Sequence, residues 1–381
     1  MMNENKPLAS ELVSKKYLTK QDIHDFAIGA NFLGSGGGGD TYITNLMVQQ
    51  VIDDGGVIEL ISVSELDDDT FIAPCSWVGA PAICSEKMPS GNEATVGLKM
   101  LEKVQGKKVD AIIANEIGGS NGLAPLLLAA SENIPIVDGD GMGRAFPESQ
   151  MTTFNLHGVP ASPIIISDEK GNCLLMDAVN PHEAERIGRS ITIEMGGTCH
   201  MFDYSCSGYD IKQCAVRGTV SLGINIGKSI REAKENGQDP FDALFAYLRA
   251  TGYYNHAGIL FDGRIIDVLR ETRNGFSVGK VIIESYSDNN NRVEVEYQNE
   301  NLKATINGRL VGITPDIITV MDRETAEAIT TEKLKYGQRV KLVGASVPPI
   351  LRTPKAISLF GPKAFGFEEE FMPIEELNQW K

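Results

Sequence analysis

The sequence predicts an α/β protein, with an N-terminal α/β domain built on a largely parallel sheet and a C-terminal domain rich in antiparallel β structure. Short apolar runs alternate with amphipathic helical segments over the first third of the chain, a pattern typical of βαβ layers. Beyond His256 the chain changes to short β-rich runs separated by turn residues. A length of 381 residues suits two domains, at about 150 residues per domain.

Capping residues mark the first helices of the N-terminal domain. Each cap precedes apolar residues at helical spacing, which predicts a helix N-terminus at that point. The caps are Thr19 with Asp22, then Asp40, then Ser90 with Glu93. We expect the three helices to end near residues 27, 55 and 104, and a further apolar helix to cover 126–131.

Four apolar runs of strand length lie between and after these helices, over 57–63, 71–81, 109–114 and 134–138. In an open parallel sheet, ligands bind at the edge formed by the carboxyl ends of the strands. We therefore expect the polar loops that follow these strands to carry the functional site.

The second half of the chain begins with a predicted hairpin over 163–178 and continues with helical segments up to about residue 252. The β-rich part covers 256–350 and is punctuated by turns such as Asn299-Glu300-Asn301. We place the domains at 1–172 and 173–381. Because no low-complexity linker separates them, we expect the two domains to be tightly docked.

Composition limits the classes of partner. The chain has 35 Lys and Arg against 51 Asp and Glu, a net charge of −16, which argues against binding nucleic acid or an anionic membrane. No apolar run approaches the roughly 20 residues of a membrane span. The first twenty residues lack the apolar core of a signal peptide, and the 6 cysteines are scattered. We expect a cytoplasmic protein that acts on a small molecule, with homo-oligomerisation left open.

A glycine-rich segment, Gly34 to Asp40, satisfies the GxGxxG pattern. The dinucleotide interpretation needs a preceding strand, and the preceding segment here looks helical, so we expect no nicotinamide cofactor. Two interpretations remain: a tight turn where two elements pack, or a loop whose backbone N–H groups contact a ligand beside a helix N-terminus. The second makes substrate-binding candidates of Gly36, Gly37, Gly38, Gly39 and Asp40.

Gly227-Lys228-Ser229 resembles the end of a phosphate-binding loop. That motif needs glycine at position 222, where this chain has Leu222, and it needs a strand before it. Leu222, Ile226 and Ile230 instead share one helical face. We expect a helix here and no ATP.

Polar residues follow two successive predicted strands, and we expect them to meet at one sheet edge. Glu116 and Asn121 follow the strand 109–114, and Asp138, Asp140 and Arg144 follow the next. Gathered carboxylates push one another's pKa values apart, which makes acid and base roles available. In the alternative interpretation the aspartates are helix caps or turn residues and Arg144 forms a structural ion pair.

We expect Gly37 to lie within ligand reach of Asp138 or Asp140. Arg144 is a candidate for holding an anionic substrate group or for neutralising a carboxylate. Glu148, further along the same polar loop, joins the substrate-binding candidates. A divalent metal held by the carboxylates is left open, whereas the Cys and His spacings match no zinc template.

Several strings occur in this order in one family. They are FLGSGGGGD, SEKMPSGNE, NEIGGSNGLAPL, IPIVDGDGMGRAFPESQMTTF, GTVSLGINIGKSI, PDIITVMD and KYGQRVKLVG. The sequence thereby resembles the S-methyl thiohydantoin desulfurase family, often labelled hydantoinase/oxoprolinase-like, over about residues 15–370. The stretch CHMFDYSCSGYD, 199–210, departs from the usual pattern.

The resemblance implies an N-terminal α/β domain, a C-terminal domain with much β structure, and hydrolysis of an S-methylated thiohydantoin to a hydantoin with loss of methanethiol. On the matching positions, Glu116, Asp138 and Asp140 would supply the general acid and base. Backbone N–H groups of 36–39 with Asn121 would stabilise developing charge, and Arg144 would hold a substrate carboxylate. The alternatives are a hydantoin or oxoproline amidohydrolase subunit and a non-catalytic ligand-binding or regulatory protein.

Overall fold

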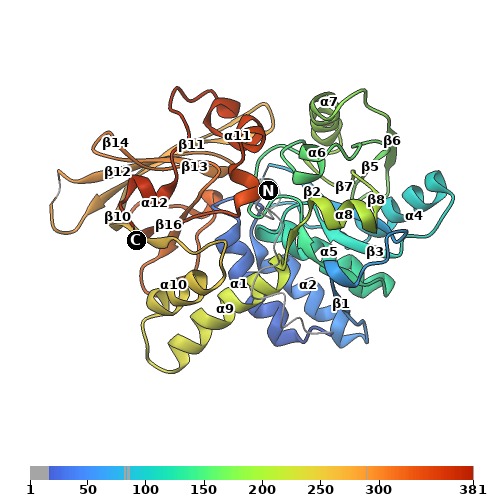
Figure 1. Ribbon diagram of the computed structural model, residues 1–381, viewed down its shortest axis with the longest axis horizontal. Helices are drawn as coiled ribbons and strands as arrows, with labels where there is room; N and C mark the ends of the chain where they lie inside the picture. Colours follow the sequence, from blue (N-terminus) through green and yellow to red (C-terminus); the bar gives the residue numbers. More distant parts are fainter. Residues whose placement is uncertain (1–16, 81–82, 84–85, 289, 381) are drawn as a thin grey trace.

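Two β-sheets occupy separate halves of the computed structural model, which describes residues 17–80, 83, 86–288 and 290–380 (Figure 1). Residues 1–16, most of the segment in which we saw no signal peptide, lie outside the described residues. The α/β class is confirmed, with a mostly parallel N-terminal layer and an antiparallel C-terminal sheet. Within the described part of the chain, no helix is long and apolar enough to cross a bilayer.

Over the described residues, the N-terminal sheet has nine strands, ordered β1-β4-β3-β2-β7-β5-β6, with β8 beside β2 and β9 beside β4. Strands β1 to β4 pair in parallel, whereas the remaining pairings are antiparallel. Strands β1, β2 and β3 fall within their predicted runs, and β4 extends beyond the fourth. Their bounds are Leu60–Ser62, Phe71–Gly79, Ala111–Ala114, Ile136–Asp140, Ile164–Ser167, Cys173–Met176, Thr198–Phe202, Cys206–Ser207 and Val216–Arg217.

Both faces of the sheet are buried at strands β3 and β4, and this explains their continuous apolar runs. Along β3, Ile112 packs into one core and its neighbours Ala111 and Ile113 pack into the other. Along β4, Ile136 packs into the first of these cores and Val137 packs into the second. Because side chains alternate along a strand, a strand covered on both faces needs apolar residues at every position.

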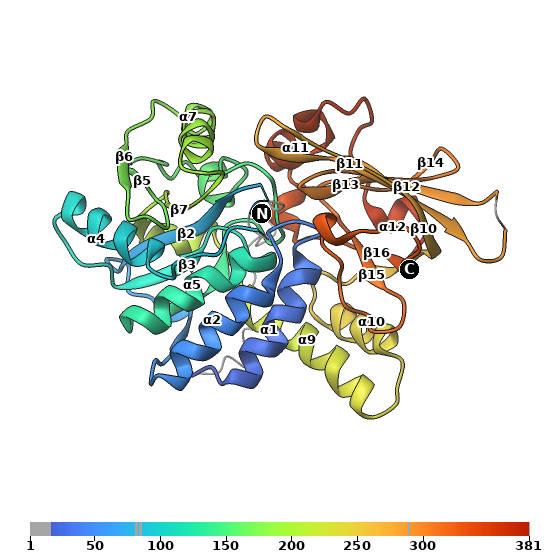
Figure 2. The same ribbon diagram turned by 180° about the vertical axis from the view of Figure 1, so that it is seen from behind.

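Helices α1, α2 and α5 lie side by side over one face (Figure 2). Helix α1 begins at the predicted Thr19–Asp22 capping box and continues to Leu33, so it ends about six residues later than predicted and leads directly into the glycine-rich loop. The α-helices are α1 Lys20–Leu33, α2 Thr41–Asp53, α4 Glu93–Gln105, α5 Gly119–Glu132, α6 Thr153–Leu156, α7 Pro181–Glu194, α8 Gly208–Cys214, α9 Thr219–Glu235, α10 Pro240–Ala250, α11 Pro354–Phe360 and α12 Ile374–Leu377.

The C-terminal sheet is antiparallel throughout, in the order β14-β13-β12-β11-β10-β16-β15. One face packs a compact apolar core that includes Ile265, Val281 and Leu342. Its strands are β10 Ala257–Arg273, β11 Phe276–Ser285, β12 Arg292–Gln298, β13 Glu300–Ile306, β14 Arg309–Ile313, β15 Ile317–Asp322 and β16 Arg339–Ala345.

The N-terminal sheet continues past the domain boundary that we expected after residue 172. Strands β6 to β9 all follow that residue and still belong to the first sheet. The expected boundary falls between β5 and β6, whose residues pair from Ile164 with Met176 to Ser167 with Cys173. A cut there would separate the two strands of one hairpin.

The first half of the glycine-rich loop joins the two halves of the protein. Ser35 Oγ donates to the Ile318 carbonyl at 2.8 Å and accepts from the Ile318 amide at 3.1 Å. The Asn301 amide donates to the Ser35 carbonyl at 2.7 Å. The Thr331 amide donates to the Gly36 carbonyl at 2.8 Å. The packing-turn interpretation therefore describes this half of the loop.

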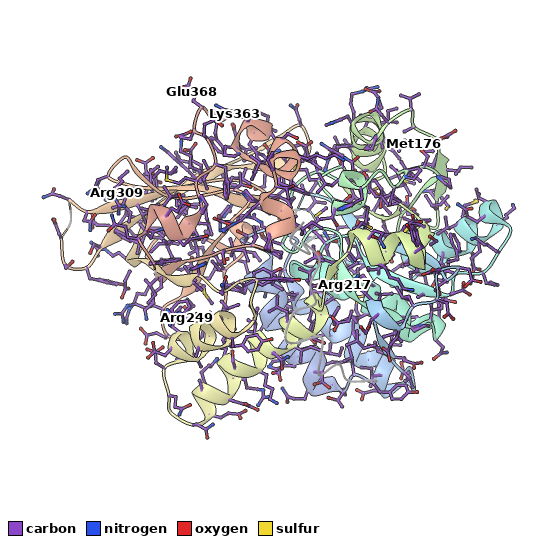
Figure 3. The ribbon with its side chains drawn as sticks, in the orientation of Figure 1. Met176, Arg217, Arg249, Arg309, Lys363 and Glu368 are labelled. Carbon is purple, nitrogen blue, oxygen red and sulfur yellow. The ribbon has the colours of Figure 1, made fainter. Side chains whose placement is uncertain are left out.

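Arg144 is fully buried in the same joint. Its guanidinium donates to the carbonyls of Ala145 and Asp316 at 2.8 Å each, of Asn301 at 3.2 Å and of Pro315 at 3.4 Å. Arg309 and Met176, both labelled in Figure 3, lie in the two halves on opposite sides of this joint. Arg144 thus holds a loop of the N-terminal half against turns of the C-terminal half.

Helices α1 and α9 cross at glycines that allow their backbones to touch. A Cβ on Gly227 would lie 1.8 Å from the Asp25 carbonyl, and one on Gly29 would lie 1.9 Å from that of Gly223. Gly227 therefore serves helix packing, and Gly227-Lys228-Ser229 lies within helix α9 as expected.

We predict that Gly227→Ala lowers the free energy of unfolding by about 2 kcal/mol or more, because the added methyl group forces the two helices apart. Gly188→Ala is the matched control within helix α7, since its Cβ would meet nothing closer than 3.6 Å. That control should be neutral or stabilising by up to about 1 kcal/mol. Urea unfolding of both variants checks this, and equal effects would refute the packing role.

We predict that Arg144→Met lowers the free energy of unfolding by about 3 kcal/mol or more, since it leaves buried carbonyls without donors. Arg309→Met removes an exposed guanidinium and should change stability by no more than about 0.5 kcal/mol. Thermal and urea unfolding measure both. A fully stable Arg144→Met protein would show that the joint does not depend on this side chain.

Candidate active site

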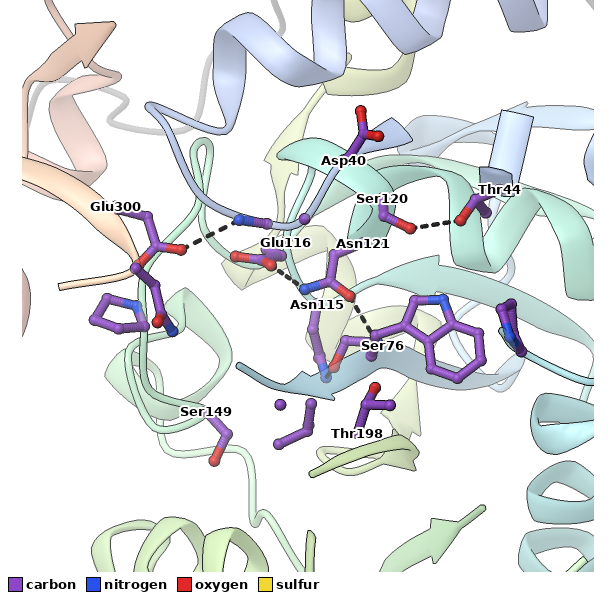
Figure 4. A pocket seen from close by; sticks show the side chains of 18 of the residues that line it. Asp40, Thr44, Ser76, Asn115, Glu116, Ser120, Asn121, Ser149, Thr198 and Glu300 are labelled. Carbon is purple, nitrogen blue, oxygen red and sulfur yellow. Dashed lines mark hydrogen bonds between the residues drawn. The ribbon is translucent and has the colours of Figure 1, made fainter. Parts of the chain in front are cut away.

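A cavity of about 350 Å³ lies between the two halves (Figure 4). Its walls come from the end of the glycine-rich loop, the start of α2, the end of β2, the loops after β3 and β4, helix α7, and residues at the start of β13. This volume is within the usual range for small-molecule sites, about 300–1,000 Å³.

Glu116 enters the cavity wall from the loop after β3, and two donors hold its carboxyl group. Asn121 Nδ2 donates to one oxygen, and the Phe146 amide donates to the other at 3.2 Å. Asn121 is itself oriented, because its Oδ1 accepts from the Trp77 amide at 2.6 Å. Glu116 is only 4% exposed. The two strands β2 and β3 thus fix the position of this carboxyl group.

Glu300 reaches the same wall from the C-terminal half, at the first residue of β13. Its Oε1 accepts from the Gly38 amide at 3.2 Å, and its Oε2 is buried without a hydrogen-bond partner among the described residues. A Cβ on Gly37 would lie 2.0 Å from Glu300 Oε1, so the glycine lets the two halves approach here. Sequence reasoning treated Glu300 as a turn residue and missed it.

Burial raises the pKa of both glutamates. Desolvation is the largest cause for Glu116, whose pKa rises well above its usual value, and the negative charge of Glu300 adds to it. Burial raises the pKa of Glu300 to about 8, although Arg144 and the Gly38 amide oppose the rise. With these raised pKa values, the wall holds at least one carboxyl proton at neutral pH.

Six of the predicted site residues line this cavity: Gly38, Gly39, Asp40, Glu116, Asn121 and Glu148. The other five are not among the described residues that line it: Gly36, Gly37, Asp138, Asp140 and Arg144. The predicted sheet edge therefore carries the cavity, but the two aspartates and the arginine lie behind its wall.

Asp138 and Asp140 lie within β4, which extends two residues beyond the predicted strand. Asp138 accepts from the Ser221 amide at 3.0 Å and from the Ser221 hydroxyl at 2.5 Å, in the first turn of α9. It therefore has the helix-capping role that we gave as the alternative. Both side chains are fully buried, which keeps them from the cavity surface.

Asp140 shapes the loop that carries Glu116. One of its oxygens accepts from the amides of Ile117, Met142 and Gly143 at 2.8–3.0 Å. Burial raises its pKa to about 7, against these hydrogen bonds. Asp140 is thus a scaffold for the two loops of the site.

The glycine-rich loop offers fewer backbone donors than we expected. The Gly37 amide donates to the Gly34 carbonyl at 2.8 Å, and the Gly38 amide is bound to Glu300. Helix α5 directs its first amides at the same loop, since Ser120 donates to the Gly39 carbonyl at 2.9 Å.

Within the described residues, no group of three or more His, Cys, Asp and Glu is arranged to hold a metal ion.

Comparisons with known proteins agree with this architecture. The chain aligns over 94% of its length with a crystal structure of a protein from Chromobacterium violaceum, covering 99% of that chain with a TM-score of 0.78 and 22% identity. This likeness concerns the fold alone. No curated protein matches the chain with significance.

Two family models match the chain in succession. The model described as S-Me-THD-like, N-terminal domain, matches residues 21–178, and the model described as S-Me-THD-like, C-terminal domain, matches residues 179–374. The chain carries both domains of this family in order, and it belongs to the S-Me-THD-like family.

Proposed function

We propose that the protein hydrolyses the thioimidate group of an S-methyl thiohydantoin ring, giving the hydantoin and methanethiol. The observation that carries this proposal is the buried Glu116 and Glu300 pair in the wall of a cavity of ring-accommodating size. Family membership supports the substrate class. The reaction changes no oxidation state, so it calls for no nicotinamide.

A carboxyl pair that shares one proton has an acid and a base ready for this reaction. The protonated carboxyl donates to the ring nitrogen, which makes the adjacent carbon more electrophilic. The ionised carboxyl takes a proton from water as its oxygen bonds to that carbon. The C–S bond then breaks, this second carboxyl returns its proton to the departing sulfur, and the first carboxyl takes the proton of the new hydroxyl group.

Glu300 Oε2 is buried without a partner among the described residues, so it has free capacity to carry the proton that this mechanism needs. Asn121 has a second N–H besides the one given to Glu116, and this N–H is a donor for charge that develops on the ring. A divalent metal at these carboxyl groups stays a prediction, and turnover after treatment with a chelator tests it.

We predict that Glu116→Gln and Glu300→Gln each lower kcat by about 10²- to 10⁴-fold, because each removes one proton-transfer group. Turnover is followed as thiol release from an S-methyl thiohydantoin, with the hydantoin identified by NMR. Glu294→Gln, at an exposed position of strand β12 outside the cavity, is the control and should keep full activity. Wild-type rates in both site variants would refute the acid–base pair. Ring opening of added hydantoin would instead indicate an amidohydrolase.

We predict that kcat/KM falls as pH rises through about 8, where Glu300 loses its proton. The same titration has a stability signature. The pKa of Glu300 is 4.5 in its ordinary state and about 8 when folded, so between these values the folded state binds more protons than the unfolded chain. The free energy of unfolding therefore falls as pH rises through this window.

Glu300→Gln should reduce this slope without removing it, because burial also raises the pKa of Asp140 and Asp203, each to about 7. Thermal unfolding at intervals between about pH 5 and pH 8 measures the slope. A Glu300→Gln protein with the wild-type slope would show that Glu300 is ionised in the folded protein throughout this range.

A further inference from the structure

Strand β6 ends the N-terminal sheet at the outer margin of the protein, between α7 and α4 (Figure 1, Figure 2). Among the described strands it pairs only with β5. The strand carries apolar side chains that water reaches, since Leu174 is 42% exposed and Leu175 is 50% exposed. Val179, just beyond the strand, is 90% exposed. An open edge of this kind can pair with a strand of another chain.

The other ends of the two sheets are occupied by the chain itself. Beside β1, the Leu18 amide donates to the Ile58 carbonyl at 3.0 Å, and the Ile329 amide donates to a carbonyl of β15 at 2.8 Å. Asn378, which ends α12, donates from its side chain to a carbonyl of β14 at 2.8 Å. Proteins commonly cover or charge such edges to prevent pairing with other chains. The apolar edge of β6 is therefore an exception within the described part of the chain.

The hairpin register determines which backbone groups of β6 point outward. At the turn, the Asp168 amide donates to the Asn172 carbonyl at 3.0 Å. Bonded and non-bonded pairs alternate along an antiparallel ladder, so Leu174 also bonds to β5. The amides and carbonyls of Cys173 and Leu175 therefore point away from the sheet. Within the described residues, no hydrogen bond occupies these outward groups.

We propose that two copies of this chain pair antiparallel through β6, about a two-fold axis at Leu174. Cys173 of each copy then lies opposite Leu175 of the other, and each such pair exchanges two backbone hydrogen bonds. Leu174 lies opposite Leu174 of the second copy, which removes apolar surface from water. Because each copy uses its one open edge, the assembly closes as a dimer. The proposal does not depend on the reaction proposed above.

The charges at the two ends of the strand favour a second copy in this orientation. Lys170 precedes β6, its side chain is 67% exposed, and its Nζ lies 3.8 Å from Glu169. Asp177 follows β6 and is exposed. Antiparallel pairing brings Lys170 of each copy to the end of the other strand that carries Asp177, so opposite charges meet twice. Because the shared strand is short, we expect a reversible dimer.

Sedimentation velocity of the intact protein tests the association over about 1–200 µM, where we expect a monomer–dimer equilibrium. Leu174→Lys places like charges across the axis and should raise the dissociation constant at least about tenfold. Leu269→Lys makes the same change at a position of β10 that is 50% exposed, and it should leave the equilibrium unchanged. A monomer throughout, or equal effects of the two variants, would overturn the proposal.

Disulfide cross-linking in a Cys173→Ala background tests the register. Leu174→Cys should form a disulfide-linked dimer under mild oxidation, because non-bonded opposite residues have Cα atoms about 4.5 Å apart, within disulfide reach. Leu175→Cys is the matched control, since it is more exposed but lies opposite position 173, which has no thiol in this background. Cross-linking of Leu175→Cys to the same extent, or of neither variant beyond the Cys173→Ala parent, would overturn the proposed pairing.

A charge exchange tests the antiparallel orientation. Lys170→Glu and Asp177→Lys should each raise the dissociation constant at least about threefold, because each brings like charges together at both ends of the shared strand. The double variant restores opposite charges and should return to within about twofold of the wild-type value. A double variant that associates no more tightly than either single variant would overturn this orientation.

Discussion

The buried guanidinium of Arg144 is the interaction on which the rest of this structure depends. It satisfies carbonyls from both halves of the protein and has no exposed surface. Burial lowers its pKa to about 10, and the nearby carboxyl groups of Glu300, Asp316 and Glu116 oppose that change, so it stays charged at neutral pH. A buried charge of this kind is tolerated only where hydrogen bonds and opposite charges surround it. The joint and the glutamate pair therefore stabilise each other.

Close backbone approach is the second constraint, and it explains the run of glycines between the two halves. A Cβ at Gly38 would lie 2.3 Å from the Gly118 carbonyl, and one at Gly37 would overlap Glu300. Gly38 also has a φ of +71°, which side chains disfavour. One continuous loop thus contacts the C-terminal sheet with its first residues and the loop after β3 with its later ones. The packing and ligand-contact interpretations each apply to a different part of it.

Much of the fold could be predicted from sequence because its signals are local. Three of these signals depend only on residues close together in the chain. They are the Thr19 capping box, the apolar runs of β1 to β4, and the change to short β-rich runs beyond His256. The same reasoning placed Glu116 and Asn121 at the sheet edge that carries the cavity. It did not indicate that Asp138 and Asp140 are buried away from the cavity lining, and β4 runs two residues further than its apolar run indicates. Pairing with β9 extends the strand, and that pairing is not visible locally.

Glu300 shows why the rest of the site could not be predicted. Its neighbours Asn299 and Asn301 give it the composition of a turn, and no spacing relates it to Glu116. Its role arises only when docking brings the start of β13 against Gly37 and Gly38. The raised pKa values are likewise a property of the assembled joint, since burial is their largest cause and the charge of Glu300 adds to the rise at Glu116. Docking therefore brings the two carboxyl groups into one wall and excludes water from both. Because the raised pKa values depend on that exclusion, we expect a change that loosens the joint to alter the protonation of this wall before it unfolds the protein.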